Sequence, residues 1–249
     1  MLHALGASGG AWSAVVDRLD NRFDCFAPDL PGFGNHADAA ETGIAATLGW
    51  LAAEIPRHAP DDYVLVGHSM GGKFATLLAA RAEAGDPGLH GLAGVVLFAA
   101  SPPSPEPVEE GRRAEMIGWF ADGPASEADA RRFVEANVAA PLPHDRLACA
   151  VADVCRSSPA AWIGWLERGA REDWSDRVGR LATPTLIVAG ADDDDLGEAN
   201  QRRLNVPHYA APRVAVVPHA AHLLPYEQPD IVAGLISDAR RKPSHFRRA

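Results

Sequence analysis

The sequence predicts an α/β protein with a mostly parallel sheet and helices on both of its faces. Apolar runs of strand length alternate with segments of helical periodicity, which is the order that βα units produce. The strands predicted at 64–66, 92–100, 184–190 and 213–217 are apolar through most of their length instead of alternating with polar residues. Strands of that kind are buried on both faces, so helices are expected on each side of the sheet.

Composition limits the classes of partner. The 249 residues form one large domain or a domain with an insertion. The formal net charge of -10 disfavours nucleic acid and anionic membranes as partners. No stretch is long and apolar enough to span a bilayer, and the N-terminus lacks the pattern of a signal peptide. Cys25, Cys149 and Cys155 show no paired spacing, so we expect a cytoplasmic protein without disulfides, metal or cofactor.

The sequence before residue 60 predicts two helices, a strand and a loop. Residues 12–19 predict a helix whose buried face carries Trp12, Val15, Val16 and Leu19. Residues 23–28 predict a short strand, and 29–34 predict a loop rich in turn residues. Residues 41–57 predict a second helix, with one apolar stripe formed by Ile44, Leu48, Leu51 and Ile55.

The strand at 64–66 leads into a glycine-bracketed serine, and a helix follows at 74–81. A strand, a tight turn with serine at its tip and a helix together form the context of the G-x-S-x-G nucleophile motif. Gly67 and Gly71 supply the small neighbours that the strained turn needs. The bare pattern occurs by chance in about one chain in ten of this length. The alternative is a serine that only caps the helix. Possible catalytic partners elsewhere in the sequence distinguish the two interpretations.

The predicted strands stop between residues 101 and 180. This segment begins with a proline-rich stretch and then predicts four short helices, one that ends near Phe120 and others at 128–138, 145–155 and 160–168. We call it the helical insertion and expect it to form a cap over a core made of 1–100 and 181–249. Its tryptophans at 119, 162, 165 and 174 either face the site or only hold the insertion to the core.

Two polar loops follow the late strands. Four aspartates, Asp192 to Asp195, come after the strand at 184–190, and a helix is predicted at 198–204. The loop at 218–225 follows the last strand and carries His219 and His222. Helix 229–240 and a basic tail, 241–249, close the chain, and the tail is expected to be mobile.

Serine, acid and histidine in this chain order have a chemical meaning. A serine hydroxyl becomes a good nucleophile when a base takes its proton, and histidine is the usual base. An acid then fixes the tautomer of the histidine and stabilises its charged form. Loops that follow parallel strands meet at the carboxyl edge of the sheet. The acidic loop, the histidine loop and Ser69 are therefore predicted to converge.

These motifs together resemble those of the α/β-hydrolase superfamily, and in particular of small bacterial esterase-like members with a helical cap. The resemblance covers nearly the whole chain and rests on the segments 3–6, 29–34, 67–72, 190–193 and 222–229. It implies an α/β-hydrolase fold with the nucleophile at Ser69, the base at His222 and the acid at Asp193. His219 is the competing base, and Asp194 is the competing acid.

The resemblance also implies further site residues. The backbone N–H groups of Leu5 and Met70 match the family's oxyanion hole, although this chain has His3-Ala4 where relatives carry His-Gly. Phe33, Trp119 and Trp162 are expected to contact the substrate. The expected activity is cleavage of a carboxylic ester of a small, partly apolar molecule through an acyl-enzyme. Lactonase or carbon–carbon hydrolase activity with the same triad, or a non-catalytic small-molecule-binding protein, are the alternatives.

One family feature is missing at the start of the chain. Relatives place two or three strands before the turn at His3, and the last of them lies beside the nucleophile strand. Only Met1 and Leu2 precede His3, and two residues span only about 7 Å. That is too short for a central strand. We therefore expect that the N-terminal strands are truncated and that the natural protein begins upstream of Met1.

Overall fold

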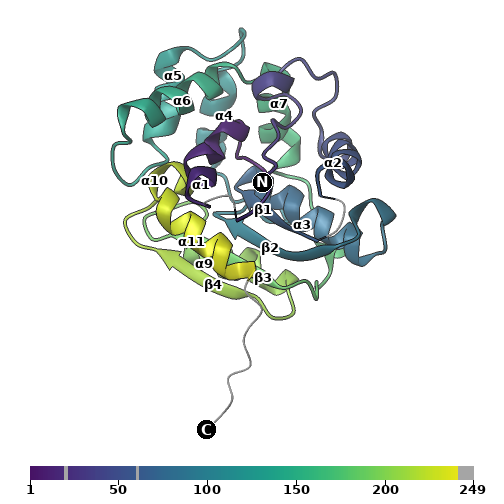
Figure 1. Ribbon diagram of the computed structural model, residues 1–249. Helices are drawn as coiled ribbons and strands as arrows, with labels where there is room; N and C mark the ends of the chain where they lie inside the picture. Colours follow the sequence, from purple (N-terminus) through teal and green to yellow (C-terminus); the bar gives the residue numbers. More distant parts are fainter. Residues whose placement is uncertain (20–21, 60–61, 241–249) are drawn as a thin grey trace.

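A parallel sheet of four strands forms the centre of the computed structural model, which describes residues 1–19, 22–59 and 62–240 (Figure 1). The strands are β1 (Tyr63–His68), β2 (Leu92–Phe98), β3 (Thr185–Gly190) and β4 (Arg213–Val217). Their order in the sheet is β1-β2-β3-β4, and every neighbouring pair is parallel. The sheet predicted from the alternation of strands and helices is confirmed.

Helices pack against both faces of the sheet. On one face, α1 (Ser13–Arg18) and α11 (Pro229–Arg240) lie side by side over Val66, Val96 and Val188 (Figure 1). On the other face, α2 (Ile44–His58) and α3 (Met70–Glu83) cover the side chains that point the opposite way. The helix α9 (Glu198–Leu204) packs beside β3. This arrangement explains why the central strands are apolar throughout.

The helix α2 shows how packing outweighs local propensity. Gly49 and Pro56 both lie within it, and each is a poor helix former. Burial of a large aliphatic side chain contributes about 1.5–3 kcal/mol, whereas a glycine costs about 1 kcal/mol relative to alanine. All four residues of the predicted stripe are buried, namely Ile44, Leu48, Leu51 and Ile55. Tertiary burial of this stripe therefore stabilises α2 despite its composition.

Between β2 and β3 the described chain is helical and contains no strand, as the sequence predicts. The helical insertion gathers above the sheet in Figure 1. Its helices are α4 (Glu110–Gly118), α5 (Glu127–Glu135), α6 (His144–Cys155), α7 (Pro159–Gly164) and α8 (Ser175–Val178), with a π-helical turn η4 (Trp165–Gly169) after α7. The remaining short elements are η1 (Gly9–Trp12), η2 (Gly34–His36), η3 (Pro87–Leu89), η5 (Val206–His208) and α10 (Leu224–Glu227).

The strand predicted at 23–28 is absent, and that prediction is wrong. A strand needs a continuous ladder of backbone hydrogen bonds to a neighbour. The α-amino group of Met1 donates to the carbonyl oxygen of Phe26 at 2.6 Å, which is one bond instead of a ladder. The segment contacts the start of the chain through this bond and is not part of the sheet.

Among the described residues, Leu2 pairs with the carboxyl end of β1, on the side away from β2. The Leu2 N–H donates to the Val66 carbonyl at 2.7 Å, and the His68 N–H donates to the Leu2 carbonyl at 3.0 Å. A cavity of about 460 Å³ continues along β1 and is lined by Phe23, Cys25, Val64 and Leu65 among others. That upstream residues occupy the position beside β1 stays a prediction. The predicted mobile tail, 241–249, lies outside the described residues, among which no helix is long and apolar enough to cross a membrane.

Candidate active site

The turn between β1 and α3 holds Ser69 in a strained conformation, with φ of 50° and ψ of -120°. A non-glycine residue at positive φ costs about 1–3 kcal/mol and persists only where its surroundings fix it. Here the Ser69 N–H donates to Phe98, and the N–H groups of Gly72 and Ser101 donate to the Ser69 carbonyl, at 2.8–3.0 Å. A Cβ on Gly67 would lie 2.5 Å from the Gly71 carbonyl oxygen, so only glycine fits there. The backbone therefore presents the Ser69 side chain at the sheet edge.

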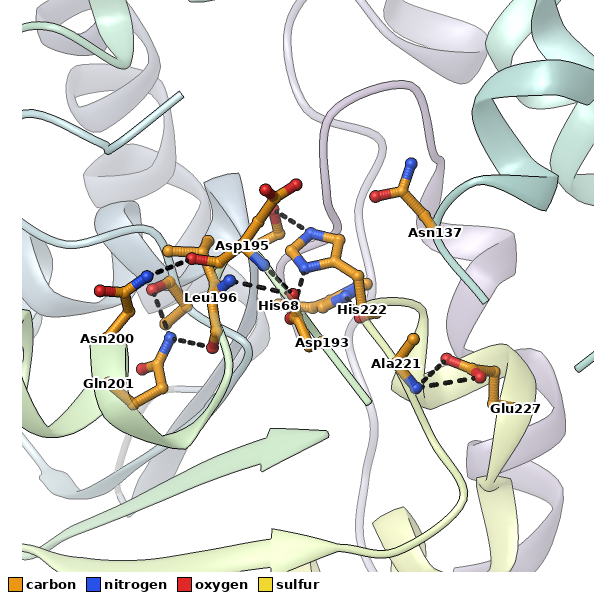
Figure 2. Close-up of polar contacts among 12 residues, drawn as sticks. His68, Asn137, Asp193, Asp195, Leu196, Asn200, Gln201, Ala221, His222 and Glu227 are labelled. Atoms are coloured by element: carbon orange, nitrogen blue, oxygen red, sulfur yellow. Dashed lines mark hydrogen bonds and ion pairs between the residues drawn. The ribbon is translucent and has the colours of Figure 1, made fainter. Parts of the chain in front are cut away.

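His222 joins Ser69 to the acidic loop. Its Nε2 lies 2.9 Å from Ser69 Oγ. Its Nδ1 lies 2.9 Å from Asp193 Oδ2, and Figure 2 labels both His222 and Asp193. The ionised carboxylate accepts a hydrogen bond from the Nδ1–H group. The proton therefore stays on Nδ1, and the lone pair of Nε2 is free to take the serine proton. The other carboxylate oxygen, Oδ1, accepts the N–H groups of Asp195 and Leu196 at 2.9 Å each. These two bonds fix the orientation of the acid.

The alternative candidates for the acid and the base do not contact Ser69 in the described structure. Asp194 and His219 are both exposed, and the part of the chain that the structure describes gives neither side chain a contact with Ser69. By contrast, the side chains of Asp193 and His222 are 2% and 13% exposed. Burial excludes water from the pair and strengthens its electrostatic interaction. The geometry thus favours the assignment of Asp193 and His222 over their neighbours.

The environment shifts the pKa values of the pair in opposite directions. Burial disfavours the charged form of His222, but the adjacent Asp193 carboxylate outweighs burial and raises the pKa of His222 above its ordinary value. Burial would also raise the pKa of Asp193, yet His222 and the two backbone donors lower it. An ionised acid beside a strengthened base is what proton transfer from serine requires.

We expect Asp193→Asn to lower kcat by about 10³- to 10⁴-fold. The amide oxygen keeps the two backbone donors of Oδ1, so the NH2 group replaces Oδ2 and donates to Nδ1, and the imidazole takes the wrong tautomer. Asp194→Asn removes the same charge one residue away and is expected to change kcat less than twofold. Steady-state kinetics of the two purified variants on one substrate provide the comparison. Equal losses in both variants would refute the assignment.

The two backbone amides predicted to bind an oxyanion are those of Leu5 and Met70. Met70 is the first residue of α3, where N–H groups have no acceptor within the helix. Leu5 lines the cavity that contains Ser69. Within the described residues neither amide donates to a protein acceptor. Ala4, which replaces the family's glycine, is not among the residues with positive φ, whereas Gly6 has φ of 71°. The extra methyl group therefore causes no backbone strain.

A ring of supporting contacts was not predicted from the sequence. His3 accepts the Leu30 N–H at 2.9 Å through Nε2, and its Nδ1 lies 2.8 Å from the Ala4 carbonyl, which fixes the turn that carries Leu5. Burial lowers the pKa of His3 to about 4, so the ring is neutral, as these two bonds require. The only local signal was the presence of a histidine before the turn.

Groups from other segments hold the loop that carries His222, and Figure 2 labels three of the residues involved, His68, Asn137 and Glu227. Neutral His68 lies 2.7 Å from the His222 carbonyl through Nε2, and burial lowers the pKa of His68 to about 3. The Asn137 carbonyl, from the helical insertion, accepts the N–H groups of His222 and Leu223 at 3.1 Å. Glu227 accepts the N–H groups of Ala221 and Ala139. These groups come from distant segments, so no spacing in the sequence relates them.

A cavity of about 60 Å³ lies directly at Ser69 and His222. Its polar lining groups are Glu106, Arg112, Asn137 and Asp195. Its apolar lining comes from the turn that carries Leu5, the acidic loop after β3, the histidine loop and the helical insertion: Ala4, Leu5, Val108, Met116, Phe133, Trp165, Leu166, Leu196 and Leu223. The insertion thus covers the site, and the aromatic residues that it places there are Phe133 and Trp165.

The three residues expected to contact substrate have other positions. Trp162 is fully buried, donates through Nε1 to the Met116 carbonyl at 2.8 Å and stacks on Phe120, so it holds the insertion together and does not line the cavity. Phe33 is also buried and packs edge-on against the His3 ring. Neither ring lines the cavity at Ser69, so their contact with a substrate stays a prediction without support from this structure. A helical stripe or a loop position does not reveal which way a ring points. Trp119 lines a second, outer cavity.

Comparison with known proteins decides the family. A model of the alpha/beta hydrolase family matches residues 1–235. The chain belongs to this family. The fold and the hydrolase class predicted from the motifs are therefore confirmed for this α/β-hydrolase.

Individual relatives agree with the family. The chain is 30% identical over 256 residues to the pimeloyl-[acyl-carrier protein] methyl ester esterase of Aromatoleum aromaticum, covering 97% of each protein. It is 39% identical over 79 residues to the protein of the same name from Aeromonas hydrophila subsp. hydrophila, a match that spans 32% of this chain and only 30% of that relative. A thermophilic esterase from Thermogutta terrifontis superposes with a TM-score of 0.76 at 23% identity, over 95% of this α/β-hydrolase and 86% of the esterase.

Proposed function

We propose that this α/β-hydrolase cleaves carboxylic esters through an acyl-enzyme on Ser69. The observation that carries the proposal is the pair of 2.9 Å distances that link Ser69 Oγ to His222 and His222 to Asp193. This arrangement allows the hydroxyl to lose its proton as it attacks a carbonyl carbon. Two relatives with an esterase name support the ester as the bond that is cleaved.

The steps follow from the positions of the groups. Ser69 Oγ attacks the ester carbonyl while His222 takes its proton, and the tetrahedral oxyanion accepts the N–H groups of Leu5 and Met70. His222 then gives the proton to the leaving alcohol, and the acyl-enzyme forms. Water, activated by His222, attacks the acyl carbon, and collapse of the second tetrahedral intermediate releases the acid and restores Ser69.

A serine nucleophile distinguishes this chemistry from related reactions. Dehalogenase and epoxide hydrolase chemistry on similar folds uses aspartate at the tip of the turn, where this chain has Ser69. The mostly apolar lining of the cavity favours an uncharged substrate. Lactone and carbon–carbon hydrolysis require the same three side chains. Assays with the different substrates are therefore needed to distinguish these activities from ester hydrolysis.

We expect the purified protein to hydrolyse p-nitrophenyl acetate and vinyl acetate, with product release measured by absorbance and by pH-stat. A γ-lactone and a vinylogous 1,5-diketone, assayed in parallel, represent the two alternative reactions. Esters should be cleaved at least tenfold faster than either. Ser69→Ala serves as the control for hydrolysis that the site does not perform. Preference for the lactone or the diketone, or no turnover of any of the four compounds, would contradict the proposal.

A further inference from the structure

One polar side chain of the cavity at Ser69 keeps a free hydrogen-bonding atom. Arg112 and Asp195 bond each other at 2.5 Å, and the Asn137 amide donates to a backbone carbonyl at 2.7 Å. Glu106 is the fourth polar side chain of the lining. Among the described residues of this lining, only Glu106 has a buried side-chain atom, Oε2, without a hydrogen-bond partner. A buried polar atom in that state favours a ligand that pairs with it.

The backbone holds Glu106 rigidly. Pro105 and Pro107 flank it in the sequence. The ring of each proline fixes its own φ, and a proline also restricts the residue before it to extended conformations. The Glu106 N–H donates to the Ala170 carbonyl at 2.7 Å, and the Glu106 carbonyl accepts the Val108 N–H at 2.8 Å. Both backbone groups are therefore bonded within the protein, and the side chain remains for a ligand.

The segment that bonds the Glu106 backbone is anchored to the nucleophile helix. Lys73, on α3, is completely buried, and its Nζ donates to the carbonyls of Gly169 at 3.0 Å and Glu172 at 2.8 Å. Ala170, which accepts the Glu106 N–H, lies between these two residues in the sequence. Lys73 thus fixes the segment beside Glu106 and directs these N–H bonds to backbone oxygens instead of to the carboxyl group.

The surroundings of the carboxyl group favour a neutral ligand. Burial raises the pKa of Glu106 and so disfavours its charged form. The groups that oppose this shift are the Ser101 hydroxyl and the nearby basic side chains of His222, Lys73 and Arg113. A cationic ligand would be repelled by these basic groups, whereas a hydroxyl group carries no charge. A hydroxyl group can also bond either form of the carboxyl group, since it both donates and accepts hydrogen bonds.

We propose that Glu106 binds a hydroxyl group that the substrate carries next to its ester. The inference rests on the proposed esterase function and narrows the substrate class. The cavity has a volume of about 60 Å³, whereas an apolar cavity that accommodates benzene has about 150 Å³. The hydroxyl group therefore lies close to the reacting carbonyl, on the α-carbon of the acyl group or on the second carbon of the alcohol. The preferred substrates are esters of α-hydroxy acids or of vicinal diols.

Three small methyl esters test the acyl side. Methyl glycolate carries the hydroxyl group, methyl propionate has a methyl group in its place, and methyl fluoroacetate keeps an electron-withdrawing atom but donates no hydrogen bond. We expect the kcat/KM of methyl glycolate to exceed that of each of the other two at least tenfold, because only the hydroxyl group pairs with the buried carboxyl group. The fluoro ester controls for the chemical activation that a polar substituent gives to the carbonyl.

The same comparison on the alcohol side uses 2-hydroxyethyl acetate, propyl acetate and 2-fluoroethyl acetate. A tenfold preference for the hydroxyl ester in at least one series supports the proposal and assigns the side of the ester that Glu106 faces. No such preference in either series, with normal turnover of vinyl acetate, would overturn it. Methyl glycinate presents an ammonium group, and a preference for it over methyl glycolate would also overturn the assigned chemistry.

The variant Glu106→Leu distinguishes recognition from a structural role. It should lower the ratio of kcat/KM between the preferred hydroxyl ester and its fluoro analogue at least tenfold. Glu106→Gln should keep most of this ratio, because its amide oxygen still accepts a hydrogen bond. A residue that only supports the fold would change both esters equally and leave the ratio unaltered. The control is Glu135→Leu, which removes an exposed carboxyl group of α5 outside this cavity and should change the ratio less than twofold.

The esterase function and the role of Glu106 can fail separately. No turnover of vinyl acetate by the wild-type protein would refute the esterase function itself. Normal turnover of vinyl acetate, with the same ratio of hydroxyl to fluoro ester in the wild-type protein and in Glu106→Leu, would refute only recognition by Glu106. The two substrate series use the wild-type protein, so they test the proposal even if Glu106→Leu folds poorly.

Discussion

Replacement of Ser69 by alanine is expected to lower kcat by about 10⁴- to 10⁶-fold, because every proposed covalent step passes through this hydroxyl. Alanine adopts the strained backbone of the turn no better and no worse than serine, since both are small non-glycine residues. The variant should therefore keep the thermal stability of the parent. Hydrolysis of vinyl acetate and thermal unfolding, measured on the same preparation, separate loss of chemistry from loss of fold.

Labelling provides the control for this prediction. A serine-directed fluorophosphonate should modify one residue of the wild-type protein, and peptide mass spectrometry should locate the modification at Ser69. The Ser69→Ala variant should remain unmodified. Full activity in that variant, or modification of a different serine in the active wild-type protein, would remove Ser69 from its role.

Replacement of His222 by alanine is expected to lower kcat by several orders of magnitude, because the serine then lacks a base. His219→Ala is the matched control on the same loop. His219 is exposed and contacts neither Ser69 nor Asp193 among the described residues, so its loss should change kcat less than twofold. A large effect of His219→Ala with a small effect of His222→Ala would exchange their roles.

The pH profile reports on the same histidine. Neutral imidazole accepts the serine proton, whereas imidazolium cannot, so kcat/KM rises as pH increases through the pKa of His222. The Asp193 carboxylate raises this pKa, so the rise is expected above the value of about 6.5 for an ordinary histidine. In Asp193→Asn the rise should move to lower pH, because burial remains while the opposing charge is gone. A profile that is unchanged in this variant would contradict the assigned interaction.

Local patterns account for the parts of the site that the sequence predicts correctly. The strand, the serine turn and the helix at 64–81 are contiguous, so their residues determine the geometry of Ser69 with little help from elsewhere. The stripe on α2 is also a local feature, and all four of its members are buried. The absence of strands between 101 and 180 follows from composition in the same way.

The sequence predictions fail where a local structure depends on contacts with a distant segment of the chain. Residues 23–28 have the composition of a strand, but a strand forms only beside a neighbour, and among the described residues Leu2 alone pairs with β1 on that side. Trp162 and Trp165 lie in the same helical stretch, yet the first is fully buried in the insertion and the second lines the cavity. Their periodicity is the same, and only the packing of α4, α5 and η4 around them decides which ring faces Ser69.

The sequence by itself determined the family, and it predicted the nucleophile and the two loops proposed to supply the acid and the base, because each is encoded in a short contiguous motif. Among the four consecutive aspartates it indicated Asp193 as the acid only through the family resemblance, with Asp194 as the competitor. The physical basis of that assignment appears only in the tertiary structure, where the N–H groups of Asp195 and Leu196 orient the Asp193 carboxylate, whose other oxygen lies against His222. The tertiary structure also decided the supports at His68, Asn137 and Glu227 and the two cavities that the insertion lines, because hydrogen bonds and cavity walls between distant segments exist only once the chain has folded.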